Sequence, residues 1–281
     1  MPANELHFSS DFKDIITYCK ENKLFLGAGN PNADILIIRK EAAIDMEKNK
    51  EQHETEYLDN VDQWEQNIQN NTQFEDVDCW FSLKPTFNPL YPYKGQRNVI
   101  ESSPIKGKKR GEKGTSRTWR FYQKLIDAIY HDDVESSHIN FHEYSFISEL
   151  NQITAPYANK IPKKDRLVSI EKRKPLFEEN FFQQFPIVIV AAGHYIRDFD
   201  INLCKLFKVE YDEQASKEFS EGLKNNWINV HYNRKGESPK LLIHTNQLSV
   251  NIEKELIKRL GEITKKSVLE QVILGKKLTN K

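Results

Sequence analysis

Two short runs of aliphatic side chains constrain the fold of this chain more than any other feature. Residues 35–38 read Ile-Leu-Ile-Ile and residues 187–190 read Ile-Val-Ile-Val, with no polar residue inside either run. A strand with one face in water alternates apolar and polar residues, whereas a strand of a parallel sheet is covered on both faces and is apolar throughout. Both runs therefore predict strands at the centre of a parallel sheet.

Two further strands and several helices complete the predicted fold. Residues 144–152 predict a strand that reaches Asn151, and residues 241–243 predict a strand that delivers His244, with residues 227–232 as a candidate extra strand. Apolar residues recur with helical spacing over residues 10–22, 119–130, 170–184 and 250–274. Because strands and helices alternate, we predict an α/β protein: a three-layer αβα fold around a central, mainly parallel four-stranded sheet, in a single domain of residues 1–281.

Charge is unevenly distributed along the chain, although the formal net charge is zero. Residues 45–78 carry eleven acidic side chains and two lysines, and they predict an acidic helical insertion. Residues 94–117 hold eight bases against two acids, and residues 160–174 hold seven against two; both predict basic loops. A basic face is the electrostatic footprint of a polyanion binder, and the alternative is a set of solvated loops.

The cysteines exclude several classes of site. Cys19, Cys79 and Cys204 lie far apart, and no pair has the spacing of metal ligands, so we predict neither a metal site nor a cofactor. Three unpaired thiols fit a reducing cytoplasm, which is the expected location. The chain shows no apolar run of membrane-spanning length and no signal pattern at its start, so we expect no membrane partner, and we expect a monomer.

Polar residues follow the four predicted strands. They are Glu41, Asn151, the pair Gly193 and His194, and His244. Ligands of open α/β sheets bind beyond the carboxyl ends of the strands, so we expect these residues to converge. A carboxylate can orient a water, an asparagine amide can read the edge of a pyrimidine, and an imidazole can stabilise negative charge on a carbonyl oxygen.

Each of these residues also has a purely structural alternative. Glu41 could form a salt bridge to one of the two bases before it, and Asn151 could be a turn residue at the end of a strand. His244 could be a core histidine, and His194 could be an ordinary loop residue. Only the geometry decides between these alternatives.

The same positions resemble the uracil-DNA glycosylase superfamily. Residues 29–38 (GNPNADILII) are similar to that family's lead into its first strand, and residues 39–43 (RKEAA) stand where members carry a glycine-x-x-proline motif with the water-activating residue. Residues 81–82, on a short predicted strand at 79–83, match its stacking phenylalanine, and residues 150–151 match its base-reading asparagine. Residues 193–194 stand at its phosphate-pinching loop, and residues 244–249 (HTNQLS) resemble its His-Pro-Ser-Pro-Leu-Ser loop.

The resemblance extends from about residue 24 to residue 260 and implies a role for each matching residue. The implied catalytic residues are Glu41, His244 and Asn151, and the implied base-binding residues are Phe81, Asn151, Lys40 and Ala42. The expected DNA-binding residues are Leu248, Asn246, Ser249, Gly193, His194, Lys108, Lys109, Arg110 and Arg117. In this set Leu248 is expected to be exposed and to fill the space that a flipped base leaves.

Departures from the family pattern shape the functional expectation. Arg39 and Ala42 replace the glycine and proline of the first motif, and Glu41 is one methylene longer than an aspartate. We therefore expect a monofunctional DNA glycosylase that acts on double-stranded DNA containing a modified or bulky pyrimidine, such as glucosylated hydroxymethylcytosine in phage DNA. The alternatives are a conventional uracil-DNA glycosylase of base excision repair, a non-catalytic module that binds modified bases, and an enzyme of free nucleosides or RNA.

Overall fold

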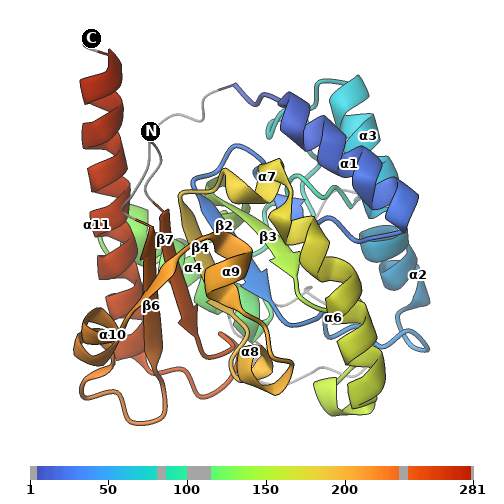
Figure 1. Cartoon of the computed structure of the whole chain (residues 1–281). Helices are drawn as coiled ribbons and strands as arrows, with labels where there is room; N and C mark the ends of the chain where they lie inside the picture. Colours follow the sequence, from blue (N-terminus) through green and yellow to red (C-terminus); the bar gives the residue numbers. More distant parts are fainter. Residues whose placement is uncertain (1–4, 81–86, 100–114, 234–239, 280–281) are drawn as a thin grey trace.

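The computed structural model describes residues 5–80, 87–99, 115–233 and 240–279 of the 281-residue chain (Figure 1). The strands are β1 (Ala28–Gly29), β2 (Ile35–Arg39), β3 (Ser145–Glu149), β4 (Ile187–Ala191), β5 (Glu210–Asp212), β6 (Ile228–Asn233) and β7 (Lys240–Thr245). The longer helices are α1 (Ser10–Asn22), α3 (Asn60–Gln69), α4 (Arg117–Tyr130), α6 (Lys163–Glu178), α10 (Glu213–Ser220) and α11 (Lys254–Thr279). The short helices are α2 (Lys50–His53), η1 (Glu54–Leu58), α5 (Phe141–Tyr144), η2 (Ala158–Lys160), α7 (Asn180–Gln183), α8 (Tyr195–Asp198) and α9 (Leu203–Phe207).

The described strands form one seven-stranded sheet in the order β1-β3-β2-β4-β7-β6-β5. Its four central strands, β3, β2, β4 and β7, run parallel to one another, as predicted. The outer strands β1, β6 and β5 are antiparallel, so the chain is a mixed α/β protein and the prediction of a four-stranded sheet was wrong. The missed strands β1 and β5 have two and three residues, which is too short for any periodic signal. The candidate extra strand is real and is β6.

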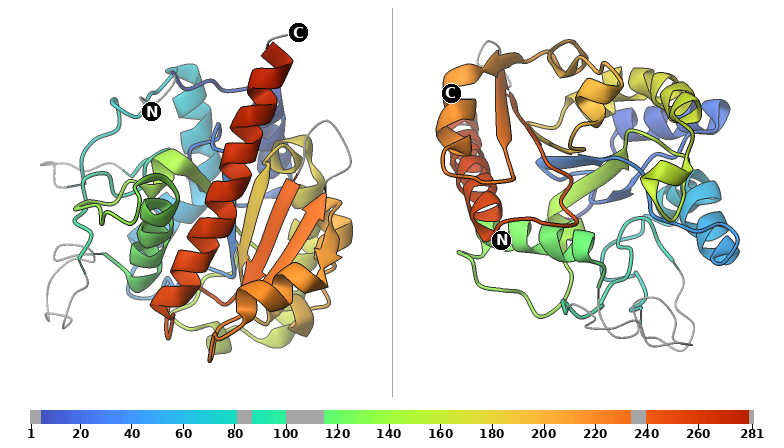
Figure 2. Two further views of the ribbon diagram at one scale, coloured as in Figure 1. Left: turned by 90° about the vertical axis from the view of Figure 1, so that its left-hand side faces the viewer. Right: turned by 90° about the horizontal axis from the view of Figure 1, so that it is seen from below.

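Alternate residues of the central strands face opposite layers of helices. In β2, Leu36 and Ile38 pack into a core with α1, α3, α6, α7 and α9, whereas Ile35 and Ile37 pack into a second core with α4 and α11. Figure 2 shows α11 lying along one face of the sheet beside α4, and Gly261 of α11 leaves room there for Ala128 of α4. Burial on both faces explains why these strands are uniformly apolar.

The helical predictions hold best where a capping residue marks a boundary. The α1 helix has the predicted bounds: the Ser9 hydroxyl accepts a hydrogen bond from the Phe12 amide at 3.2 Å, and Lys23 ends the helix with a left-handed φ of 52°. The acidic insertion is helical as predicted and forms α2, η1 and α3. Its Trp64 donates a hydrogen bond of 2.9 Å to the Gly27 carbonyl, which attaches the insertion to the sheet edge.

The second basic segment is a helix and not a loop. Most of residues 160–174 belong to α6, whose amides form regular helical bonds from its first turn. The prediction failed because this helix has no clear apolar stripe: Leu167 and Val168 point to solvent, whereas Arg173 is fully buried. The Arg173 guanidinium donates hydrogen bonds to the carbonyls of Glu149 and Phe25 at 2.6 and 2.5 Å. This basic side chain therefore forms its hydrogen bonds inside the core and not at the surface.

The short strand predicted at residues 79–83 is not observed at its start. Cys79 and Trp80 are not in a strand, and the remainder of the predicted strand lies outside the described residues.

No helix within the described ranges combines the length and the apolar character that crossing a membrane requires.

Candidate functional site

The polar residues predicted at the strand ends lie along one edge of the sheet. Glu41 and Asn151 each follow the last residue of β2 or β3 by two positions, and Gly193 follows β4 in the same way. The strand ends are in register, because Arg39 of β2 is the partner of both Glu149 of β3 and Ala191 of β4. Parallel neighbours in register bring the three turns together, and β7 adds His244 opposite Val190 of β4.

The Glu41 carboxylate is held by two neutral donors. The Tyr195 hydroxyl donates to Glu41 Oε2 at 2.6 Å, and Asn151 Nδ2 donates to the same oxygen at 3.3 Å. Burial raises the pKa of Glu41, and these two hydrogen bonds oppose that shift. Among the described residues Glu41 forms no ion pair with Lys40 or Arg39, so the salt-bridge alternative is not observed.

Asn151 is completely buried, and its amide is engaged at both ends. Its Oδ1 accepts a hydrogen bond of 3.0 Å from the Ile153 amide, while its Nδ2 donates to Glu41. In this arrangement Asn151 acts as a turn residue and also orients Glu41. Its predicted role in reading a base requires the side chain to exchange at least one of these partners.

His244 lies in β7 and is 7% exposed. Its Nε2 is 2.9 Å from the Gly193 carbonyl oxygen. Since a carbonyl only accepts hydrogen bonds, Nε2 carries the proton and Nδ1 faces the Asn229 amide nitrogen at 3.5 Å as an acceptor. Burial lowers the pKa of His244 to about 4, so the imidazole is neutral at pH 7 and offers one N–H donor.

Gly193 joins the ends of β4 and β7. Its amide donates to the Thr245 carbonyl at 2.9 Å, and its φ of 54° is a left-handed conformation that favours glycine. A β-carbon at this position would also lie 3.8 Å from Lys40 Nζ. Lys40 therefore lies between the Glu41 turn and the Gly193 turn. The neighbouring His194 is exposed and stacks on Trp227, at 6.1 Å between ring centroids.

The loop after β7 differs from its prediction. Leu248 is fully buried in the core that contains α4 and α11, so the expectation of an exposed leucine was wrong. The apolar side chain that this loop exposes is Val250, two residues later. Asn246 accepts a hydrogen bond of 2.9 Å from the Trp227 amide, and the Ser249 amide donates to the Gln247 carbonyl at 2.8 Å. In this conformation Leu248 cannot enter a base stack, because its side chain is part of the core.

The remaining predicted contact residues have different outcomes. Phe81, Lys108, Lys109 and Arg110 lie outside the described residues. Arg117 is exposed at the first position of α4. Ala42 is buried, and its amide donates to Glu149 Oε2 at 3.2 Å.

Glu149 was not predicted from the sequence, although it holds the Ala42 amide and Arg39 on either side of Glu41. The fully buried Glu149 carboxylate forms an ion pair with Arg39 and accepts hydrogen bonds from the Tyr57 hydroxyl and the Ala42 amide. One signal was present in the sequence: an acidic residue inside a buried apolar strand needs a partner. Tyr195, which follows Gly193 by two residues, gave no such signal.

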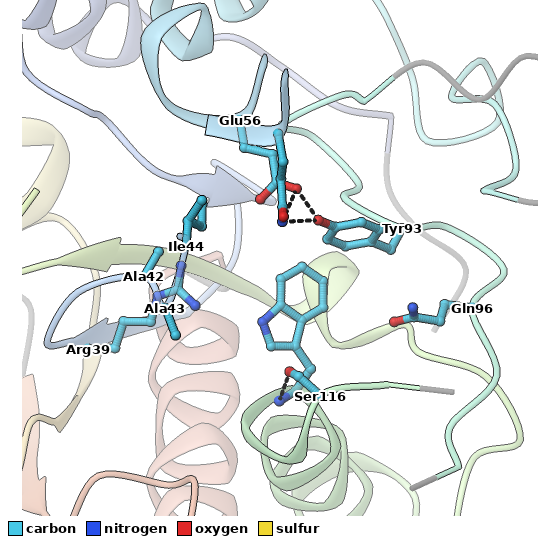
Figure 3. A pocket seen from close by; sticks show the side chains of 10 residues that line it. Arg39, Ala42, Ala43, Ile44, Glu56, Tyr93, Gln96 and Ser116 are labelled. Atoms are coloured by element: carbon cyan, nitrogen blue, oxygen red, sulfur yellow. Dashed lines mark hydrogen bonds between the residues drawn. The ribbon is translucent and has the colours of Figure 1, made fainter. Parts of the chain in front are cut away.

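A small cavity lies beside the same turn (Figure 3). Its volume is about 60 Å³. Its lining residues are Arg39, Ala42, Ala43, Ile44, Gln52, Glu56, Tyr93, Gln96, Ser116 and Trp119. Tyr93 and Trp119 meet edge to face at 4.8 Å, and Glu56 from the acidic insertion accepts hydrogen bonds from Gln52 and Tyr93. Aromatic and polar side chains thus lie together next to the residues that flank Glu41.

Neither metal-binding geometry among the described residues nor similarity to a known protein assigns a function to this site. Within the ranges that the structure describes, no group of three or more His, Cys, Asp or Glu side chains is arranged to hold a metal ion. No protein-family model matches the chain, and no curated protein matches it.

Proposed function

We propose that this chain is a monofunctional DNA glycosylase with a uracil-DNA glycosylase-like three-layer fold. It hydrolyses the N-glycosidic bond of a flipped pyrimidine in double-stranded DNA, and the base is modified or bulky rather than plain uracil. The observation that carries the proposal is the half-buried Glu41 carboxylate, which Tyr195 and Asn151 orient where three parallel strands end. The neutral imidazole of His244 at the next strand end supplies the second chemical group.

In the proposed reaction Glu41 orients and deprotonates a water that attacks C1′ of the sugar. The bond between C1′ and the base nitrogen breaks, and its electron pair leaves with the base. The His244 Nε2–H exchanges the Gly193 carbonyl for the base carbonyl oxygen and stabilises the charge that develops there. Burial raises the pKa of Glu41, which makes its ionised form a stronger base than an exposed carboxylate. Extruding the base costs a few kcal/mol.

Small side chains and polar neighbours support a modified base. Ala42 and Ala43 line the cavity beside the Glu41 turn, and Gln52 and Glu56 from the acidic insertion line its other side. Hydroxyl groups on a decorated pyrimidine are suited to amide and carboxylate partners of this kind.

One observation favours a second candidate, a hydrolase of free nucleosides or nucleotides. An exposed Leu248 would favour a duplex substrate, but this side chain is buried. An enzyme that binds a free nucleoside needs no side chain to replace an extruded base. The same catalytic residues would serve both substrates.

An excision assay on a panel of substrates tests the proposal. Duplexes with uracil, hydroxymethyluracil, hydroxymethylcytosine or glucosylated hydroxymethylcytosine are incubated with the protein, and alkali reveals abasic sites. The matching free nucleosides are followed by chromatography. We expect one modified duplex to be cut, and we expect Glu41→Gln and His244→Ala to abolish the cutting. Release of uracil alone would favour the conventional enzyme, and turnover of nucleosides alone would favour the second candidate. Tight binding without abasic product would favour a binding module.

A further inference from the structure

Three basic side chains gather around two aromatic rings next to Glu41. Lys40 Nζ lies 4.8 Å from the centre of the Tyr195 ring, and the Arg166 guanidinium lies 5.6 Å from the same ring. Arg166 is also 5.4 Å from the centre of the Phe199 ring, where Lys163 Nζ lies at 6.0 Å. The three cations come from the turn after β2 and from the first turn of α6, and the rings belong to α8 and the residue that follows it.

None of these three cations forms an ion pair within the part of the chain that the structure describes. Other bases nearby do: Lys174 pairs with Glu171 at 2.6 Å, and Arg197 pairs with Asp198 at 2.9 Å. Arg166 and Lys40 are both half-buried, and the Arg166 Nε is buried without a hydrogen-bond partner. Half-buried cations that are close together and lack a carboxylate repel one another, and a bound anion removes that cost.

The electrostatics of Lys40 agree with this geometry. Burial lowers the pKa of Lys40, and the like charge of Arg166 lowers it further, while Glu41 and Asp198 oppose the shift. Asp198 is already paired with Arg197, and Glu41 accepts its hydrogen bonds from Tyr195 and Asn151. Among the described residues, neither acid lies at ion-pair distance from Lys40, Arg166 or Lys163.

We propose that Lys40, Arg166 and Lys163 form a phosphate-binding subsite beside Glu41. Arg166 has the fork geometry that binds two phosphate oxygens, and Lys40 and Lys163 add point charges from either side. The Arg166 guanidinium also donates a hydrogen bond of 3.3 Å to the Tyr195 hydroxyl, and that hydroxyl donates to Glu41. A phosphate held here is thus connected to the proposed catalytic carboxylate through a single side chain.

The phosphate ester comes from one of two sources. It is either a backbone phosphodiester of DNA next to the target base or the terminal phosphate of a free nucleotide. The subsite deepens the proposed function and rests on it only for this choice of molecule. Binding of phosphate itself requires no excision, so the two proposals can fail separately.

The test compares Arg166→Gln and Lys40→Gln with the matched control Lys164→Gln. Lys164 is exposed in the same turn of α6 and has no contact of this kind with either ring. Affinity for an unmodified fluorescent duplex is measured over a salt series, and affinity for deoxycytidine monophosphate is measured with deoxycytidine as the reference. Thermal melting of each variant checks that it is folded.

For a backbone phosphate, we expect Arg166→Gln and Lys40→Gln each to weaken duplex binding about tenfold and to reduce the salt slope by about one, whereas Lys164→Gln changes affinity less than twofold. The double variant should lose less than the product of the two single losses, because both residues hold one phosphate. For a free nucleotide, the losses appear with the monophosphate alone.

Equal effects of all three variants on either probe would show general attraction and would overturn the subsite. Unchanged binding of both probes in Arg166→Gln and Lys40→Gln would overturn it as well. If these variants lose binding but the excision assay is negative on every substrate, the subsite stands and the glycosylase proposal fails.

Discussion

Two carboxylates at neighbouring strand ends, the half-buried Glu41 and the fully buried Glu149, have opposite environments. Glu149 is fully buried, pairs with Arg39, and accepts hydrogen bonds from Tyr57 and the Ala42 amide. Glu41 has no cation at ion-pair distance among the described residues and accepts only from neutral groups. A fold depends on both partners of a buried ion pair, because loss of one leaves the other charge uncompensated. A carboxylate whose pKa is raised by burial is more typical of a functional site. The difference supports a structural role for Glu149 and the proposed catalytic role for Glu41.

The largest expected effect tests the structural half of this comparison. Glu149→Ala leaves the half-buried Arg39 guanidinium without its counter-charge, and we expect a loss of about 3 kcal/mol in the free energy of unfolding, the lower end of the range for buried pairs. Urea denaturation of the variant and the parent protein measures this loss. Glu41→Gln is the control and should cost less than about 1 kcal/mol, because the glutamine oxygen still accepts the hydrogen bonds from Tyr195 and Asn151. Similar losses for both variants would end the distinction.

The variant Glu41→Gln tests the proposed catalytic role of Glu41. Glu41→Gln should lower the rate of excision on the preferred substrate by about 10²–10⁴-fold, the usual contribution of a general base. The same variant should keep its stability, since glutamine accepts the same hydrogen bonds.

Glu41 should also make stability depend on pH. Its pKa is raised above 4.5, so the native state binds a proton that the unfolded chain releases, and stability falls as pH rises above 4.5. Glu41→Gln should lack this fall, and denaturation between pH 4 and pH 8 checks it.

His244 provides a third test, with the opposite dependence on pH. The folded protein holds it neutral with a pKa of about 4, whereas the unfolded chain has the ordinary value of 6.5. The unfolded state therefore gains a proton first, and stability falls as pH decreases from 6.5 towards 4, by at most about 3 kcal/mol. His244→Gln should lose less stability than the parent protein over this interval. Parallel curves for the two proteins would mean that His244 is exposed to solvent.

The class of the fold could be predicted because a strand that is buried on both faces is apolar throughout, and this pattern is visible in the sequence of each strand alone. The runs at residues 35–38 and 187–190 are β2 and β4, and both lie at the centre of the sheet. Strands β1 and β5 could not be found in this way, since their existence depends on the strand beside which they lie. Long-range pairing, and not local composition, decides such edges.

The candidate site was predictable only in part, for a related reason. Strand ends indicated where Glu41, Asn151 and His244 converge, because topology fixes that edge. The direction of a side chain depends on packing, and there the prediction for Leu248 failed: an apolar residue in a polar loop was expected in solvent and lies in the core. Tyr195 was missed for the same reason, since its hydroxyl meets Glu41 only after β2 and β4 pair.

The smallest expected effects sharpen the comparison through two tyrosines. Tyr57→Phe removes a hydroxyl from Glu149, and Tyr195→Phe removes one from Glu41, so the same atom is lost beside each carboxylate. We expect Tyr57→Phe to cost about 1–3 kcal/mol of stability, because a buried carboxylate oxygen loses a donor, and to leave the shape of the pH–rate profile unchanged. Tyr195→Phe should cost less stability and should move the acid limb of that profile to higher pH, because its hydrogen bond lowers the pKa of Glu41. Urea denaturation and excision rates between pH 4 and pH 8 measure both effects. An unchanged profile in Tyr195→Phe would mean that ionisation of Glu41 does not limit the reaction, and the general-base role would then pass to another group.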